Sequence, residues 1–327
     1  MKNKNILIFL DHKTIKMLFL GFSSGLPILL VFSTLSVWLI KAGIDRSTVT
    51  LFSWAGFAYA FKYLWSPIID NFRLPFFQKL GHRRSWLLFA QLMVVLSLVA
   101  TSFTDPSKGL MSISITITFL AIFSATQDIV IDAYRIESAP QNLQGPLSSM
   151  YIAGYRLAML VGGAGSLWIA SYLGSETYNQ AVWKFVYLSM AILMIIGMVT
   201  TLLSKELKIK KNNFLKVSEH TKFLFVFIIS LAGFIYLYNL IENPFLTNDT
   251  ANKFVFSLIR ISLCFIFAGL IISLSISVNF ISKKKTIKIY IEPLSNFTNR
   301  YGKFAISIIF LIGLYRIADI VMGVVAN

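Results

Sequence analysis

The sequence is poor in the residues that soluble enzymes use for structure and chemistry. Its 327 residues include one cysteine and three histidines, and only 13% are charged, against about a quarter in a typical soluble domain. Cys264 alone cannot form an intramolecular disulfide and is expected to be a small core residue. His12, His82 and His220 lie far apart, and the chain contains no HExxH, nucleophile-elbow or Walker A motif. The sequence therefore predicts no enzyme, no metal site and no bound cofactor.

Acidic residues are also scarce, whereas apolar residues are abundant. The chain has 14 Asp and Glu against 30 Lys and Arg, and 56% of its residues are hydrophobic. Its mean hydropathy is +0.72. A chain this apolar cannot bury its hydrophobic residues in a water-soluble core, so we expect it to lie in a bilayer. The basic residues fall in short links between apolar runs, which indicates a membrane topology signal rather than nucleic-acid binding.

Apolar runs of about twenty residues predict an all-α polytopic membrane protein with about nine transmembrane helices. We place these helices at residues 17–40, 48–69, 85–103, 109–131, 147–173, 181–203, 222–242, 254–280 and 304–325.

The distribution of charge predicts the orientation of these helices. The N-terminal tail and the even-numbered links together hold roughly four times as many Lys and Arg residues as the opposite side. The N-terminus MKNKNILIFLDHK starts like a signal peptide, but its apolar run stops at Asp11. We therefore expect a multi-pass membrane protein with a cytoplasmic N-terminus.

Two long lysine-rich links divide the predicted helices into groups. The divisions are a cytoplasmic tail (1–16), six helices (17–203), a basic cytoplasmic loop (204–221), two helices (222–280), a second basic loop (281–303) and one last helix (304–327). Nine helices would leave Asn327 outside the cell, directly after a helix, so the chain is expected to be truncated.

Ionisable residues inside spans are costly and usually face a cavity or a partner. Lys62 and Arg156 are predicted to serve a polar cavity and bind substrate. Asp128 is expected either to carry a proton or to pair with one of those cations. Asp132 and Arg135 follow on the same helical face, where an interfacial ion pair is one interpretation and a gate or proton role is the other.

The link between the second and third spans carries a second charge pattern. Asp70 lies at one helix end, and Arg83 and Arg84 lie just before the next helix. With Arg135, these residues could form a cytoplasmic charge clamp that exchanges partners when a transporter opens.

Small and aromatic residues mark other spans. The stretches GFSSGLP (Gly21–Pro27) and VGGAGS (Val161–Ser166) predict close helix packing, with a bend at the proline. Tyr155 and Trp54 are candidates for stacking on sugar rings, and Gln127 is a further substrate-binding candidate, although such aromatic residues are also typical of cores and membrane interfaces.

Three stretches resemble the AmpG-type muropeptide permeases, a branch of the major facilitator superfamily. They are GFSSGLPILL, then FKYLWSPIID followed by GHRRSWLL, and finally SATQDIVIDAYR. The last is similar in the related acetyl-CoA transporters. The chain departs from the superfamily's loop motif at Ser66, Asn71 and His82.

This resemblance implies a major facilitator-like bundle of two six-helix repeats with two additional helices between them. The last predicted helix, with Arg316 and Asp319 as an ion pair, would then begin an incomplete second repeat. The family imports N-acetylglucosaminyl-anhydromuramyl peptides with protons. The resemblance therefore implies a symporter of the bacterial inner membrane that is driven by the proton gradient and carries such small molecules. The alternatives are a carrier for acyl-CoA or another anionic solute, and a remnant that does not transport unless a separately encoded C-terminal half completes it.

Overall fold

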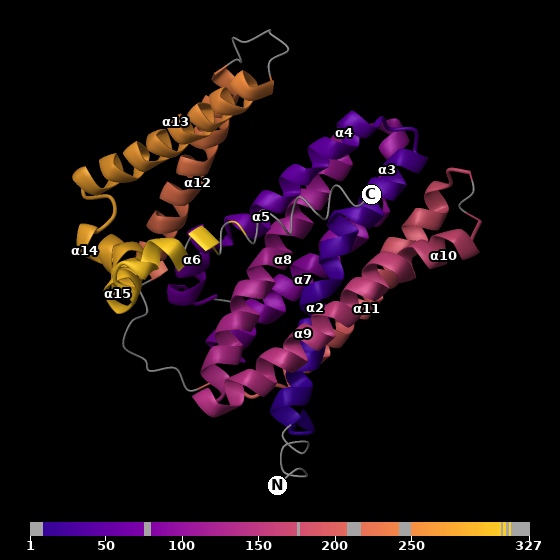
Figure 1. The fold of residues 1–327 in the computed structure, drawn as a ribbon, viewed down its shortest axis with the longest axis horizontal. Coiled ribbons are helices and arrows are strands. Elements are labelled where there is room, and N and C mark those ends of the chain that lie inside the picture. Colours follow the sequence, from indigo (N-terminus) through magenta and orange to yellow (C-terminus); the bar gives the residue numbers. More distant parts are fainter. Residues whose placement is uncertain are drawn as a thin grey trace. The chain divides into compact units, whose positions relative to one another are not determined.

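The computed structural model describes residues 9–74, 80–174, 177–207, 217–241 and 250–308, together with residues 310, 311 and 314. Every regular element in these ranges is a helix or a helical turn (Figure 1), so the predicted all-α class is confirmed. Seven of the described helices are long and apolar enough to cross a bilayer. The protein is an all-α polytopic membrane protein.

The chain forms two compact units. The larger unit contains α2 (His12–Val31), α3 (Ser33–Lys41), α4 (Arg46–Leu51), η1 (Phe52–Ala55), α5 (Gly56–Ala60), η2 (Lys62–Leu64), α7 (His82–Ser102), η4 (Pro106–Lys108), α8 (Leu110–Ser138), η5 (Gln141–Leu143), α9 (Gln144–Leu160), η6 (Val161–Gly165), α10 (Ser166–Tyr172) and α11 (Gln180–Leu203). The smaller unit contains α12 (Val217–Leu240), α13 (Thr250–Ser277), α14 (Lys283–Thr286), η8 (Ile287–Ile291) and α15 (Glu292–Tyr301), with residues 67–73. The helix α6 (Ser66–Asn71) begins at the boundary between them.

Helix α2 lies at the centre of the larger unit, where it packs against α8, α9 and α11. Glycines allow α2 and α9 to approach closely, because a Cβ on Gly21 would lie 2.1 Å from the carbonyl oxygen of Tyr151. In the same way, a Cβ on Gly154 would lie 1.9 Å from the carbonyl oxygen of Leu18. The close helix packing predicted from GFSSGLP is therefore confirmed.

The bend predicted at Pro27 stays a prediction, and the helix is interrupted shortly after that residue. Pro27 lies inside α2 and lacks the N–H that would continue the hydrogen-bond ladder. Helix α2 ends one turn later at Val31, and Phe32 (φ −108°, ψ −90°) separates it from α3. The stretch VGGAG of the fifth span forms the π-helical turn η6, and the Thr34 hydroxyl donates to the carbonyl of Gly162 at 2.8 Å.

The second predicted span, residues 48–69, differs from the expected continuous helix. It consists of α4, η1, α5, η2 and the start of α6, and the helix is interrupted at Phe61 (φ −100°, ψ 11°) and Trp65 (φ −106°, ψ −4°). Pro67 cannot donate to the carbonyl of Tyr63, and the hydroxyl of Ser66 donates to that carbonyl instead, at 3.1 Å. Local backbone chemistry thus breaks a segment whose hydropathy alone suggests one helix.

The smaller unit is built on a helical hairpin. Helices α12 and α13 run side by side, with α14 and α15 at one end of the pair (Figure 1). Helices α12 and α13 correspond to the two additional predicted spans. Phe223 and Val226 of α12 pack there with Ile281 and Ile289. The last predicted helix, residues 304–325, lies mostly outside the described residues, and the proposed repeat boundaries stay predictions.

Candidate functional site

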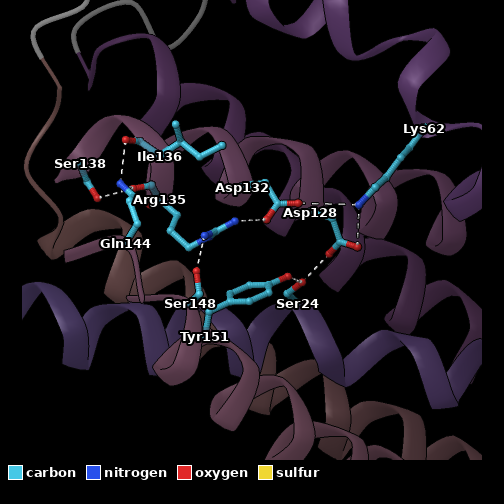
Figure 2. A network of polar contacts seen from close by, with 10 residues as sticks. All are labelled: Ser24, Lys62, Asp128, Asp132, Arg135, Ile136, Ser138, Gln144, Ser148 and Tyr151. Carbon is cyan, nitrogen blue, oxygen red and sulfur yellow. Dashed lines mark hydrogen bonds and ion pairs between the residues drawn. The ribbon is translucent and has the colours of Figure 1, made fainter. Parts of the chain in front are cut away.

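Lys62 and two aspartates of α8 form the centre of a polar network in the larger unit (Figure 2). The Nζ of Lys62 lies 3.5 Å from Asp128 Oδ2 and 4.0 Å from Asp132 Oδ2. The Asp128 side chain is 8% exposed and that of Asp132 is 42% exposed. The two carboxylates are one helical turn apart, so one cation reaches both. The structure therefore shows the Lys62–Asp128 pairing that the sequence left as one of two alternatives.

The backbone explains why Lys62 can reach α8. Lys62 is the first residue of the 3₁₀ turn η2, directly after the interruption at Phe61. A 3₁₀ turn inside a longer helical segment is typical of a functional hinge. The position of this cation thus depends on a part of the chain that is not a regular α-helix.

Helices α2 and α9 also contribute polar groups near Asp128. The hydroxyl of Ser24 donates to Asp128 Oδ1, and it lies 2.8 Å from the hydroxyl of Tyr151. Ser24 is 1% exposed. Gly25 allows this arrangement, because a Cβ there would lie 2.4 Å from the carbonyl oxygen of Tyr155 on α9. The close α2–α9 packing therefore brings two hydroxyl groups to one buried carboxylate.

Arg135 extends the network along α8. Its Nη2 lies 3.5 Å from Asp132 Oδ1, and its Nη1 donates to the hydroxyl of Ser148 on α9. The Gln144 amide donates to three carbonyls at the end of α8, at 2.9 to 3.3 Å, and thereby satisfies groups that a helix end leaves open. The predicted Asp132–Arg135 ion pair is confirmed, and a gating role for Arg135 stays a prediction.

The charges of this network balance. Lys62 and Arg135 supply two cations, while Asp128 and Asp132 supply two carboxylates. Removing one charge from a partly buried set leaves its partner uncompensated, which is costly. Protonation of either aspartate would therefore favour movement of a cation to another acceptor.

Gln127, a substrate-binding candidate, joins a different buried network. Its amide donates to the hydroxyl of Ser23 at 3.3 Å, and the amide of Gln91 approaches the same oxygen at 3.4 Å. Thr201 donates to Gln91 Oε1 at 2.9 Å. These polar side chains connect α2, α7, α8 and α11 in the core of the unit.

The remaining substrate-binding candidates lie in different environments. Tyr155 is half-buried, and its ring centroid lies 6.1 Å from that of Tyr151. Arg156 is exposed on α9, with Nη1 3.7 Å from the sulfur of Met159. Trp54 lies in η1 and is 39% exposed. The structure thus brings Tyr155 close to the network, and roles for Arg156 and Trp54 stay predictions.

The expected cytoplasmic clamp has a partner that the sequence did not identify. Arg83 of α7 forms a two-pronged ion pair with Glu137 of α8, with Nη2–Oε1 at 2.6 Å and Nε–Oε2 at 3.0 Å. Asp70 lies in α6, in the part assigned to the smaller unit, so a clamp between Asp70 and the arginines stays a prediction.

Arg84 and Glu206 join the same end of α7 to the end of α11. The Arg84 guanidinium donates to the carbonyls of Thr201 and Leu202, at 3.3 and 2.7 Å. The Glu206 carboxylate accepts the backbone N–H groups of Arg83 and Arg84, both at 3.2 Å. An anion at a helix N-terminus compensates the open N–H groups there.

Sequence reasoning missed Ser24, Tyr151, Glu137 and Glu206. Ser24 belongs to GFSSGLP, which by sequence alone indicates only a run of small residues for helix packing. Glu206 lies in a link whose other charged residues are mostly basic. Glu137 lies two residues after Arg135, and nothing in this local sequence indicates that its partner is the distant Arg83. Arg316 and Asp319 lie outside the described residues.

A model of the family named acetyl-coenzyme A transporter 1 matches residues 14–224. Among curated relatives, “Putative transporter AmpG 4” of Rickettsia conorii is 36% identical over 213 residues, which is 64% of this chain and 50% of that protein. The anhydromuropeptide permease of Escherichia coli K12 is 38% identical over 207 residues, or 63% of this chain and 40% of that protein. The chain thus matches about half the length of these relatives or less.

Proposed function

Because this chain belongs to the transporter family whose model is named acetyl-coenzyme A transporter 1, we propose that it is part of an inner-membrane carrier that imports anhydromuropeptides together with protons. The observation that carries the proposal is the partly buried Lys62–Asp128 pair, in a region of 207 residues that is 38% identical to an anhydromuropeptide permease. Ion pairs of this kind within membrane helices mark transport or proton pathways.

Lys62 and Asp128 are proposed to couple the proton to the substrate. An ionised Asp128 holds Lys62 in the network, and a proton on Asp128 removes that attraction. Lys62 would then turn toward Asp132 or toward a carboxylate of the muropeptide. Such an exchange of partners links the charge state of α8 to the arrangement of the surrounding segments.

A second half is proposed to complete the pathway. The relatives named as transporters are about twice as long as the matched region, and transporters of this kind bind substrate between two halves that move against each other. We propose that a separately encoded C-terminal half supplies the facing wall. We also propose that the N-terminus lies in the cytoplasm, as the distribution of Lys and Arg predicts.

Uptake measurements test these statements. Right-side-out membrane vesicles containing this chain, alone and together with any partner encoded downstream, are energised and given radiolabelled anhydromuropeptide. Accumulation should require the gradient and should be abolished in Asp128→Asn, whereas the exposed loop variant Asp45→Asn should behave as wild type. Unchanged accumulation in Asp128→Asn would exclude the proton role.

The family name favours one alternative cargo, acetyl-CoA. Unlabelled acetyl-CoA added to the same vesicles separates the two substrates, because it should not compete with the muropeptide if the main proposal holds. Strong competition by acetyl-CoA would favour the alternative. Absence of uptake of either solute, with and without a second half, would favour a protein that does not transport.

A further inference from the structure

The smaller unit contains a basic recess at one end of the α12–α13 hairpin. Its cavity volume is about 360 Å³, and four lysines line it, namely Lys222, Lys283, Lys284 and Lys285. One acidic residue, Glu219, also lines it and forms an ion pair with Lys285. The lining therefore has three more positive than negative charges.

The recess lies where two membrane-spanning helices end. The apolar span of α12 begins at Thr221, and that of α13 ends at Ser277. Lys222 is in the first turn of one span, and Lys283 and Lys284 follow shortly after the other. All three are exposed. Such a position corresponds to the level of lipid headgroups.

Apolar surfaces lead away from this recess along both helices. Phe225 and Ile228 of α12 are 54% and 60% exposed, and Leu274 and Val278 next to the end of α13 are 63% and 71% exposed. The ring of Phe280 lines the recess, with the Nζ of Lys222 5.5 Å from its centroid. A ligand in the recess would thus meet cations at one end and hydrocarbon-facing side chains at the other.

We propose that this recess binds the headgroup of an anionic phospholipid. Lysines supply charge-assisted hydrogen bonds to a phosphate diester, and basic recesses beside membrane helices suit such headgroups. The adjoining apolar faces of α12 and α13 would accommodate the acyl chains. A free phosphate shares the charge but not the hydrocarbon, so the structure favours the lipid.

The helix after the lysines supports the interfacial position of this end of the unit. Helix α15 ends in Arg300 and Tyr301, and the Tyr301 ring lies 4.8 Å from that of Phe297. Aromatic and basic residues together on a short helix are typical of a segment that lies in the headgroup region. Helix α15 thus places this end of the unit in the headgroup region, whereas the residues that line the recess all precede it in the sequence.

Native mass spectrometry of the purified full chain tests the proposal. The protein is delipidated in detergent and titrated with cardiolipin, phosphatidylglycerol, phosphatidylcholine or inorganic phosphate. The two anionic lipids should bind at least about tenfold more tightly than phosphatidylcholine, because each lysine near the headgroup adds electrostatic attraction to a negatively charged lipid. The double variant Lys283→Gln and Lys284→Gln should lose this preference.

The matched control removes two charges from the same basic segment but outside the recess, in Arg300→Gln and Lys303→Gln. It should retain the preference for anionic lipids within about twofold. If both double variants lost the preference for anionic lipids equally, the proposal would be overturned, because the attraction would then come from the overall positive charge and not from the recess. Binding of inorganic phosphate as tight as that of cardiolipin, or equal affinity for all three lipids, would also overturn it.

Discussion

The ammonium group of Lys62 lies 3.5 Å from the carboxylate of Asp128, although the two residues come from different segments of the bundle. The Asp128 side chain is 8% exposed, and it also accepts a hydrogen bond from the hydroxyl of Ser24. Lys62 therefore supplies a positive charge that compensates this carboxylate.

Replacing Lys62 with Met should destabilise the protein by about 3 kcal/mol, because it removes the cation from an ion pair whose carboxylate is 8% exposed. Thermal unfolding of the purified protein in detergent measures the change. The double variant with Asp128→Asn should recover a large part of the loss, since no buried charge then remains without a partner.

The control for this variant is Lys108→Met. Lys108 pairs with Asp105 on the surface, where its side chain is 83% exposed, so the change should cost about 0.5 kcal/mol or less. If Lys62→Met and Lys108→Met had equal effects, the Lys62–Asp128 pair would not be a structural centre of the bundle.

Gly154→Ala should separate α2 from α9 and destabilise the protein by about 2 kcal/mol, as expected for overpacking. The reason is that the new Cβ would lie 1.9 Å from the carbonyl oxygen of Leu18. Gly145→Ala on the same helix is the matched control, because a Cβ there meets open space, and it should stabilise the helix slightly. Equal unfolding midpoints for the two variants would contradict the close packing.

Arg83→Lys should weaken the connection between α7 and α8, because an ammonium group cannot reproduce both guanidinium contacts with Glu137. We expect a coupling energy of about 1–2 kcal/mol between Arg83→Lys and Glu137→Gln in a double-mutant cycle of unfolding. Additive effects of the two substitutions would show that the ion pair contributes nothing specific.

Asp105 and Tyr178 predict a pH dependence outside the spans. The Tyr178 hydroxyl donates to Asp105 at 2.6 Å. This bond lowers the pKa of the Asp105 carboxyl, and burial together with Asp105 raises the pKa of Tyr178 to about 12. The bond should therefore stabilise the fold above the usual aspartate pKa and below the usual tyrosine pKa, with loss at both extremes.

The difference in unfolding midpoint between wild type and Tyr178→Phe measures this effect. It should be constant between about pH 5 and pH 9 and should shrink as the pH falls through the lowered pKa of Asp105 or rises toward that of Tyr178. The difference in ultraviolet absorbance between the same two proteins should show a tyrosine titration near pH 12. A Tyr178 titration at pH 10 would contradict the hydrogen bond.

Features that depend on residues close together in the sequence could be predicted from the sequence alone. Long apolar runs require helices in a bilayer, because only a helix satisfies its own backbone there. The Asp132–Arg135 pair follows from helical spacing, and the glycines of GFSSGLP indicate close helix packing. Hydropathy could not show the interruptions of residues 48–69, because they depend on hydrogen bonds at Phe61, Trp65 and Pro67 rather than on polarity.

The sequence by itself determined that this chain is a bundle of membrane helices whose few ionised residues need partners. Only the tertiary structure decided which partners they have. Asp128 pairs with Lys62 and Ser24, and Arg83 pairs with Glu137, because α2, η2, α7 and α8 pack in one particular arrangement. Charge and spacing along a chain specify which residue types can pair, whereas the choice among distant cations and carboxylates depends on how the helices pack.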